Sequence, residues 1–257
     1  MCPYSFIYER QVSRLRIFRI KIGNIVAQVQ SNYSYIERIC EPYLSDVPPN
    51  CTISIDDKML ECEREAIEAV PNTGTSSVDS EDWFLEVYAL LHRLLPVLPE
   101  HKMLFMHGSA IKYREKAYIF IAPSGTGKST HSRLWKERFG EDVTIINDDK
   151  PFLAFRDHKV YLCGTPWRGK HNIGENIEAE LAGICILSQG SKNCMRSVSA
   201  VDAVQDIIQQ SNLHRYETNS LLALDLIDEL LNTVPVYRLS CTPTLDAVDA
   251  ALMMVKG

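Results

Sequence analysis

The stretch Ala122-Pro123-Ser124-Gly125-Thr126-Gly127-Lys128-Ser129 decides the fold, because it has the spacing of a phosphate-binding loop that leads directly into a helix. Glycines let backbone N–H groups turn toward an anion, Lys128 can reach the β- and γ-phosphates of a nucleotide, and the Ser129 hydroxyl can bind Mg²⁺. The apolar, β-branched residues 117–121 predict a buried strand before the loop, and residues 130–139 predict a helix after it. We therefore expect a strand–loop–helix unit that binds ATP with Mg²⁺.

The alternative interpretation of this stretch is a glycine-rich turn without a ligand, and Ala122 stands where the usual pattern has glycine. The residues expected to contact the nucleotide are Ser124, Gly125, Thr126, Gly127, Lys128, Ser129 and Thr130.

A pair of carboxylates follows a second β-branched run, residues 143–147, and begins at Asp148, twenty positions after Lys128. If a helix joins the two strands in a right-handed crossover, both strand ends lie at one edge of the sheet, and the aspartates face the phosphate loop. Adjacent residues on a strand point to opposite faces, so we expect Asp148 to accept the proton of the attacking hydroxyl and Asp149 to bind Mg²⁺. A simple Asp-Asp-Lys-Pro turn ahead of a hairpin is the alternative.

Three motifs together resemble a known superfamily over residues 104–150. Met106-His107-Gly108-Ser109-Ala110 before a strand, the Ser-Gly-Thr-Gly-Lys-Ser-Thr loop and the Asp148-Asp149 pair have the order and spacing found in the HPr kinase/phosphorylase and ATP-dependent phosphoenolpyruvate carboxykinase superfamily. The resemblance implies an α/β fold with a P-loop core on a mixed β-sheet flanked by helices, and it implies that Asp148 acts at the transfer centre.

The carboxykinases in that superfamily use the histidine of the Met-His motif and the second aspartate at a second metal site. By position, this resemblance implies that His107 and Asp149 bind a second divalent ion, such as Mn²⁺, in this chain. A hydrogen-bonded structural histidine is the alternative for His107.

Residues 164–174 contain three glycines, Trp167, Arg168 and Lys170. Arg168 offers a planar fork to phosphate or carboxylate, Lys170 a compact charge, and Trp167 a flat wall. We expect this segment to be a mobile lid that closes over the γ-phosphate and the acceptor. The alternative is a solvated loop with Trp167 packed in the core.

Composition limits the remaining possibilities. The 257 residues carry a formal net charge of −6, which argues against general nucleic-acid binding. The longest apolar runs have the length of strands, so we expect no membrane segment and a cytoplasmic protein. The eight cysteines are scattered and form no Cys-x-x-Cys pair, which indicates reduced thiols.

The chain is expected to divide into a small β-rich N-terminal segment, residues 1–78, and a P-loop kinase-like catalytic domain, residues 79–257. The first contains a hairpin of residues 15–20 and 25–29 and a strand at 51–55, followed by a flexible connection at 71–80. The second begins with a helix at 81–95 capped by Ser80. Beyond the second aspartate, the patterns predict strands at 152–155, 159–163, 181–187 and 234–239, and helices at 201–213, 220–231 and from 242 onward.

These observations favour an ATP-dependent kinase that moves the γ-phosphoryl group to a hydroxyl acceptor, either a seryl side chain of a protein or peptide or a small hydroxylated metabolite. The catalytic residues expected are Lys128, Asp148, Arg168 and Lys170. Two alternatives stay open: phosphoenolpyruvate carboxykinase chemistry, and a nucleotide-binding regulatory module that transfers nothing. A second carboxylate beside a basic loop favours catalysis over the module. The sequence does not specify the acceptor or the oligomeric state.

Overall fold

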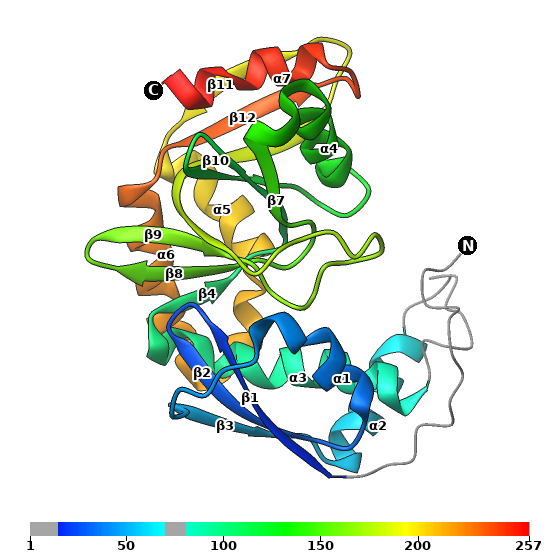
Figure 1. Ribbon diagram of the computed structural model, residues 1–257. Helices are drawn as coiled ribbons and strands as arrows, with labels where there is room; N and C mark the ends of the chain where they lie inside the picture. The colour runs from blue at the N-terminus through cyan, green and yellow to red at the C-terminus, as the bar shows by residue number, and fades with distance from the viewer. Residues whose placement is uncertain (1–14, 70–80, 257) are drawn as a thin grey trace.

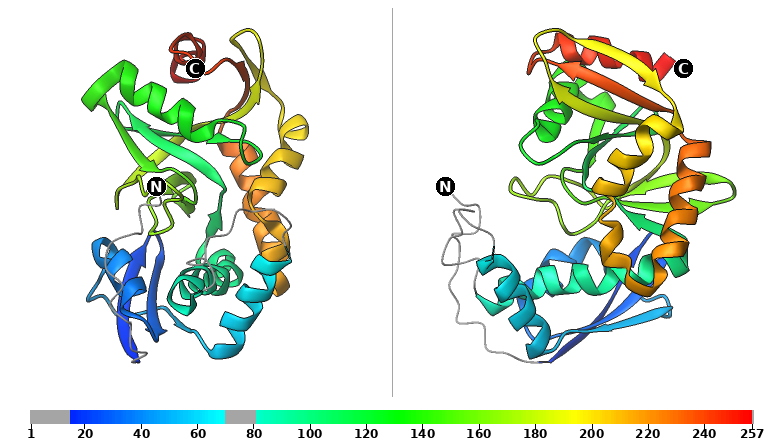
Figure 2. Two further views of the ribbon diagram at one scale, coloured as in Figure 1. Left: turned by 90° about the vertical axis from the view of Figure 1, so that its right-hand side faces the viewer. Right: turned by 180° about the vertical axis from the view of Figure 1, so that it is seen from behind.

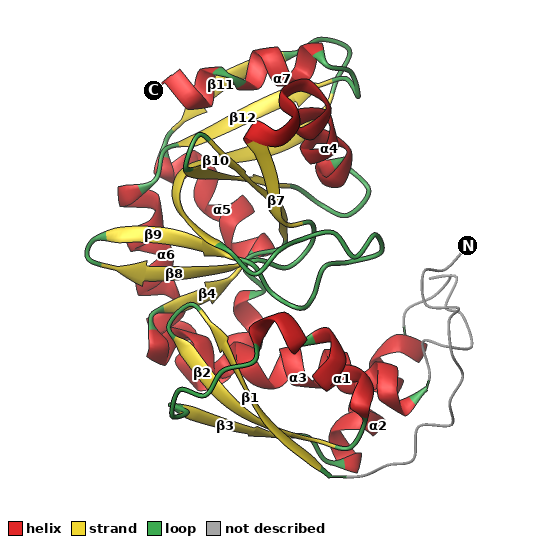
Figure 3. Cartoon of the chain, viewed as in Figure 1, coloured by secondary structure: helices red, strands yellow, loops and turns green. Residues whose placement is uncertain are grey.

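The computed structural model describes residues 15–69 and 81–256, which form two β-sheets with flanking helices (Figure 1, Figure 3). The larger sheet has the strand order β4-β8-β9-β10-β6-β5-β7, and β12 and β11 extend it beside β10. Pairs β6–β10 and β10–β12 are parallel, whereas β5 is antiparallel to both β6 and β7. The molecule is therefore a mixed α/β protein with a mixed sheet, as predicted. The strands of this sheet are β4 (Met103–Phe105), β5 (Gly108–Tyr113), β6 (Lys116–Ile121), β7 (Val143–Asn147), β8 (Phe152–Arg156), β9 (Lys159–Cys163), β10 (Glu178–Gln189), β11 (Cys194–Val198) and β12 (Val236–Cys241).

The N-terminal sheet contains β1 (Arg16–Ile22), β2 (Ile25–Ser31) and β3 (Cys51–Ser54). The predicted hairpin is confirmed: β1 and β2 pair antiparallel around Gly23, whose φ of 53° suits glycine at a tight turn.

The description of this region as β-rich is wrong, because it also holds helices α1 (Ser34–Ile39) and α2 (Asp57–Glu68). The Asp56 carboxylate caps α2 by accepting a bond from the Met59 N–H at 2.9 Å. Residues 61–66 are mostly charged, so the helix is polar on average and was missed, although it contains good helix formers and its apolar residues share one face. The proposed boundary between residues 78 and 79, the connection at 71–80 and the Ser80 cap lie outside the described residues.

Helix α3 (Asp82–Leu94) lies against the N-terminal sheet rather than starting the larger one (Figure 1). It contacts β3, α1 and α2, and it continues into a 3₁₀ segment, η2 (Leu95–His101), which leads to β4. One continuous apolar cluster joins Ile20 of β1, Leu90 of α3 and Ile119 of β6. The two sheets therefore share a core.

Helices cover both faces of the larger sheet (Figure 2). One face packs on α4 (Lys128–Phe139), α7 (Asp246–Ala251) and α8 (Met253–Lys256), and the other on α5 (Ala200–Gln210) and α6 (Ser220–Thr233). Strand β6 is apolar on both faces, which is why helices cover both. Phe120 points to Trp135 of α4, whereas its neighbours Ile119 and Ile121 join the cluster on the α6 side. Burying each such side chain contributes about 1.5–3 kcal/mol.

Strands β6 and β7 run parallel to each other, since both pair antiparallel with β5 between them. Gly108 pairs with Ile121, and Ala110 pairs with Asn147. The carboxyl ends of β6 and β7 and the start of β5 therefore meet at one edge of the sheet.

Two further expectations concern the whole chain. Within residues 15–69 and 81–256, no helix has both the length and the apolar character needed to cross a bilayer. The cysteines in those ranges are free thiols.

Candidate active site

The loop between β6 and α4 has the backbone that its glycines predict. Gly125 and Gly127 have φ values of 79° and 114°, and a Cβ at either position would meet no atom within 4 Å, so the requirement for glycine is conformational. Thr126 tightens the turn, because its hydroxyl donates to the Pro123 carbonyl at 2.9 Å. Helix α4 begins after Gly127 without a side-chain cap, which leaves its first N–H groups to an anion.

The Lys128 side chain is 7% exposed and lies folded along the loop. Its Nζ donates to the Ala122 carbonyl at 2.9 Å and lies 3.5 Å from the Pro123 carbonyl. Burial lowers the pKa of Lys128, and the nearby charges of Asp149 and Asp148 oppose that shift. The loop lysine and both aspartates therefore belong to one electrostatic cluster.

Asp148 is 5% exposed and is held by hydroxyl groups. Its Oδ1 accepts a bond from Ser109 Oγ at 2.6 Å, and Ser109 Oγ is in turn 2.6 Å from Ser132 Oγ on α4. Burial raises the pKa of Asp148, whereas hydrogen bonds from Ser109 and Ser129 lower it. The structure thus brings the Ser129 hydroxyl, predicted to bind Mg²⁺, to Asp148.

Two basic groups also act on Asp148. The charges of His171 and Arg133 both lower its pKa. From the sequence, no role was expected for Ser132 or Arg133, Ser109 was included only as part of the Met-His motif, and His171 only as part of the basic loop. The tertiary fold brings Ser109, His171 and Arg133 to Asp148 and places Ser132 beside Ser109.

Asp149 has different partners from Asp148. Its Oδ2 forms an ion pair with Lys150, and its Oδ1 lies 3.4 Å from His107 Nε2. Burial acts to raise the pKa of Asp149, but the His107 hydrogen bond and the Lys150 charge outweigh it and lower the pKa to about 2. Asp149 is therefore ionised at neutral pH.

His107 is fixed from the other side by α5. Its Nδ1 lies 3.0 Å from the Gln210 side-chain oxygen, and the backbone N–H of His107 donates to the backbone carbonyl of Gln210 at 2.7 Å. This arrangement aims Nε2 at Asp149, so the two residues implied by the resemblance do lie together. Among the described residues, no group of three or more His, Cys, Asp or Glu side chains is placed to hold a metal ion. A cation at this position would need further ligands from Ser129, water or phosphate.

Asn147 shapes the turn that carries the two aspartates. Its side-chain oxygen accepts bonds from the Asp149 and Lys150 N–H groups at 2.9 and 2.7 Å, and its Nδ2 donates to Thr165. An asparagine that bonds the backbone two and three residues ahead is a recognisable turn signal, and it was present in the sequence.

The first half of the segment at 164–174 is fixed to the core through Trp167. The expectation that Trp167 forms the flat wall of a lid is therefore wrong. Trp167 is 4% exposed, stacks on Phe152 with ring centroids 5.8 Å apart, and donates from Nε1 to the Val87 carbonyl at 2.8 Å. Composition suggested a lid because a tryptophan among glycines and basic residues has no apolar neighbours in the sequence. The groups that bury Trp167 come from other parts of the chain.

The surroundings of Arg168 and Lys170 do not include the loop between β6 and α4. The Arg168 guanidinium lies 5.9 Å from the Tyr43 ring centroid, and its Nε is buried without a hydrogen-bond partner in the described residues. Lys170 is exposed.

The second half of the segment lies over the aspartates. A Cβ at Gly169, where φ is 68°, would come 2.8 Å from Asp149 Cβ, so only glycine fits there. The Asp148 N–H donates to the Ile173 carbonyl at 3.2 Å.

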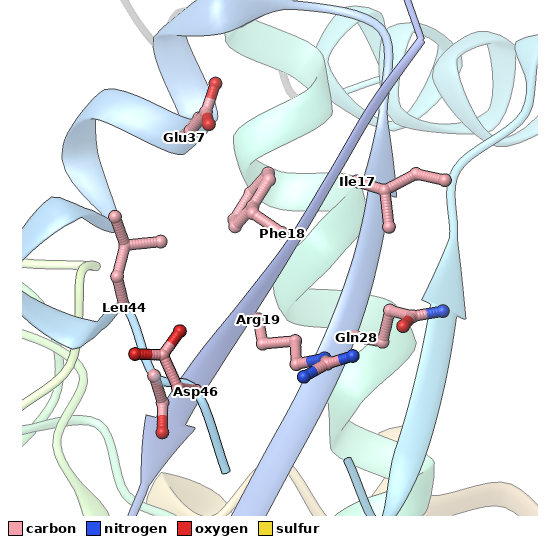
Figure 4. Close-up of a pocket in the computed structure, with 8 residues that line it drawn as sticks. Ile17, Phe18, Arg19, Gln28, Glu37, Leu44 and Asp46 are labelled. Atoms are coloured by element: carbon pink, nitrogen blue, oxygen red, sulfur yellow. The ribbon is translucent and has the colours of Figure 1, made fainter. Parts of the chain in front are cut away.

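An open hollow of about 480 Å³ adjoins the loop between β6 and α4. It is lined by Pro123, Ser124, Gly125, Thr126, Leu187, Ser188 and Gln189. Another hollow of about 340 Å³ lies beside β1, near Arg19, Glu37 and Asp46 (Figure 4). The β1 hollow shares no residue with the phosphate loop or the aspartates, so it is separate from this site.

The sequence matches no protein-family model, and no curated protein matches it. Among solved structures, the Hpr(Ser) kinase/phosphatase from Coxiella burnetii is similar over 60% of this chain and 93% of that chain, with 10% identity and a TM-score of 0.34. A likeness at this level carries no argument about function, so the site stands on its own geometry.

Proposed function

We propose that this chain is an ATP-dependent kinase that transfers the γ-phosphoryl group to a hydroxyl acceptor. The observation that carries the proposal is the convergence of Lys128, Ser129 and Asp148 at one sheet edge, where a loop with open N–H groups begins a helix. Phosphoryl transfer needs mainly positioning and neutralisation of charge, and these residues offer both.

Each residue has a proposed role. The loop residues Ser124 to Thr130 bind the phosphates, Lys128 neutralises the β- and γ-phosphates, and Asp148 accepts the proton of the attacking hydroxyl. Ser109 supports Asp148, because its 2.6 Å bond fixes the carboxylate direction. Arg168 lies over Tyr43, away from Asp148. Lys170 and His171 both lie at the exposed tip of the segment, and the charge of His171 lowers the pKa of Asp148, so these two residues are the candidates for contacting the transferred group.

The residues fit Mg²⁺ bound with ATP. Asp149 is ionised and Ser129 lies beside Asp148, so oxygen ligands suited to a hard cation surround the loop. Bound Mg²⁺ would supply positive charge to the phosphate oxygens. Asp149 is already paired with Lys150 and His107, so binding a metal there requires at least one of them to yield. A second divalent ion at His107 and Asp149 is part of the same proposal.

Two alternatives make different predictions. Carboxykinase chemistry requires a dicarboxylate substrate, and a regulatory module requires only that ATP binding change the conformation. Asp148 favours transfer over the module, because a pure sensor has no use for a buried carboxylate at the acceptor side.

The test is to incubate the protein with γ-labelled ATP and Mg²⁺ against separate pools of hydroxylated metabolites, amino acids, seryl peptides and oxaloacetate. Label on a hydroxyl compound or a seryl side chain supports the kinase. Label in phosphoenolpyruvate, with loss of carbon dioxide from oxaloacetate, would favour the carboxykinase. Tight ATP binding with no label transferred to any acceptor or to water would favour the module.

A further inference from the structure

We propose that the hollow beside the phosphate loop holds the nucleoside half of ATP, and that Gln189 is a specificity-determining residue there. This inference rests on the proposed function and extends it. The hollow shares Ser124, Gly125 and Thr126 with the proposed phosphate site, and it adds residues 187–189 of β10 as a side for the base and ribose.

The fold builds the hollow from the ends of two neighbouring strands. Strand β10 pairs in parallel with β6, and Ile186 lies opposite Ile121. Strand β10 continues beyond this pair to Gln189, whereas β6 ends at Ile121. The last residues of β10, 187–189, therefore lie next to the loop at 122–126 that leaves β6. The hollow between them measures about 480 Å³ and is open to solvent, so a ligand can extend out of it.

The order of the strands gives the direction in which a bound nucleotide must extend. Asp148 follows β7, which lies on one side of β6 beyond β5, whereas β10 lies on the other side of β6. Neighbouring strands are roughly 4.8 Å apart, so the ends of β7 and β10 are separated by three such spacings. If the γ-phosphate meets Asp148 and the remaining phosphates follow the loop N–H groups, the nucleoside points toward β10 and the hollow.

The lining suits a nucleobase, which has flat apolar faces and a polar edge. Pro123 is exposed and provides apolar surface, Leu187 lines the hollow from the core and is 4% exposed, and Ser188 and Gln189 provide hydrogen-bonding groups. Both polar residues are exposed, so they are free to meet a ligand.

Gln189 is weakly tied to the loop. Its Nε2 lies 3.5 Å from the Gly125 carbonyl and 3.4 Å from the Thr126 carbonyl, which are long distances for N–H···O bonds. The Gln189 side chain therefore loses little free energy when it gives up these contacts to form hydrogen bonds with a base. Its amide offers both donors and an acceptor, as reading a base edge requires.

The test compares two ligands by calorimetry in the presence of Mg²⁺: ATP, and inorganic tripolyphosphate, which has the phosphates without the nucleoside. Gln189→Ala removes the amide, Ser188→Leu fills part of the hollow without adding charge, and Gln205→Ala on the exposed face of α5 is the matched control. We expect Gln189→Ala to weaken ATP binding about 3- to 10-fold, and Ser188→Leu to weaken it as well, while tripolyphosphate binding changes less than about 2-fold. Gln205→Ala should match the wild type for both ligands.

Unchanged ATP affinity in both hollow variants, or equal losses for ATP and tripolyphosphate, would overturn this inference while leaving the kinase proposal standing. Failure of the wild-type protein to bind either ligand would overturn both proposals.

Discussion

Asp148 and Asp149 are adjacent in the sequence, yet they have almost no partners in common. Hydroxyl groups of Ser109 and Ser129 hold Asp148, whereas Lys150 and His107 hold Asp149. Strand alternation predicted that the two would differ, because neighbouring side chains point to opposite faces. It did not predict the partners, since all but the adjacent Lys150 come from α4, β5 or the residue just before β5, far away in the sequence.

At the same scale, Lys128→Ala should weaken MgATP binding by at least about 10-fold and remove nearly all transfer. The phosphates lose a charged donor worth roughly 1.5–3 kcal/mol. Calorimetry checks the affinity, with Lys58→Ala on the exposed surface of α2 as the control. Wild-type affinity in a folded Lys128→Ala protein would remove the phosphate-loop assignment.

Asp149→Asn should raise the Mg²⁺ concentration needed for half-maximal transfer, and excess Mg²⁺ should restore part of the rate. An amide is a poorer ligand for a hard cation than a carboxylate. The measurement is transfer rate against Mg²⁺ concentration at fixed ATP. A loss that no concentration of metal relieves would instead give Asp149 the structural role of holding Lys150 and His107.

Because of Glu86 on α3, we expect the free energy of unfolding to depend on pH. This carboxyl group is fully buried, accepts bonds from the N–H groups of Asn32 and Tyr33 that precede α1, and has its pKa raised to about 7 by burial. Its folded-state pKa thus exceeds its ordinary value of 4.5. The resulting stabilisation is complete below that ordinary value and is lost as the pH rises through about 7, with a slope of at most about 1.4 kcal/mol per pH unit.

Urea unfolding at several pH values from about 5 to 8 measures this effect. Glu86→Gln should flatten the decline, whereas Glu137→Gln, an exposed position on α4, should leave it unchanged. An equally steep decline in Glu86→Gln would show that other groups cause it.

At the scale of elements, the segment at 164–174 shows what composition can and cannot tell. Its glycines and basic residues suggested a lid over the γ-phosphate and the acceptor. The structure places the segment close to the aspartates, because Gly169 packs on Asp149 and the Ile173 carbonyl accepts a bond from the Asp148 N–H. Composition could not show that Trp167 would be buried, since the carbonyl of Val87 and the ring of Phe152 come from other parts of the fold. Helix α2 was missed because its residues are mostly polar, although its few apolar side chains share one face of the helix.

Of the segment at 164–174, which was expected to move as a whole, we expect only the exposed tip, residues 170–172, to be mobile. Hydrogen exchange in the free protein should be fast across the tip and slow at residues 164–167, because Thr165 and Trp167 are buried and bonded. Adding MgATP with an acceptor should slow exchange at the tip. Slow exchange throughout, with no response to ligand, would make the segment ordinary surface structure.

At the scale of the whole molecule, the strand–loop–helix unit and the strands around it were predictable, because each has a strong local pattern. The way the parts combine was not. Strand β5 lies between β6 and β7, and α3 joins the N-terminal sheet, both through long-range pairing that periodicity does not encode.

The shared core also predicts how the chain unfolds. Since β1, α3 and β6 contribute to one apolar cluster, the two sheets should unfold in a single transition. Far-ultraviolet circular dichroism and tryptophan fluorescence should give the same urea midpoint. Two separated midpoints would instead support independent units, as a division near residue 78 implies.

One experiment tests most directly whether Lys128, Ser129 and Asp148 form one phosphotransfer centre. It measures the rate at which γ-label moves from MgATP to acceptor or water, together with ATP affinity, in the wild type and in Asp148→Asn. We expect the wild type to transfer label. Asp148→Asn should bind MgATP nearly as well but react roughly 10²- to 10⁴-fold more slowly, as loss of a positioned base requires. Equal transfer rates in the two proteins, or ATP binding with no transfer in the wild type, would contradict this assignment.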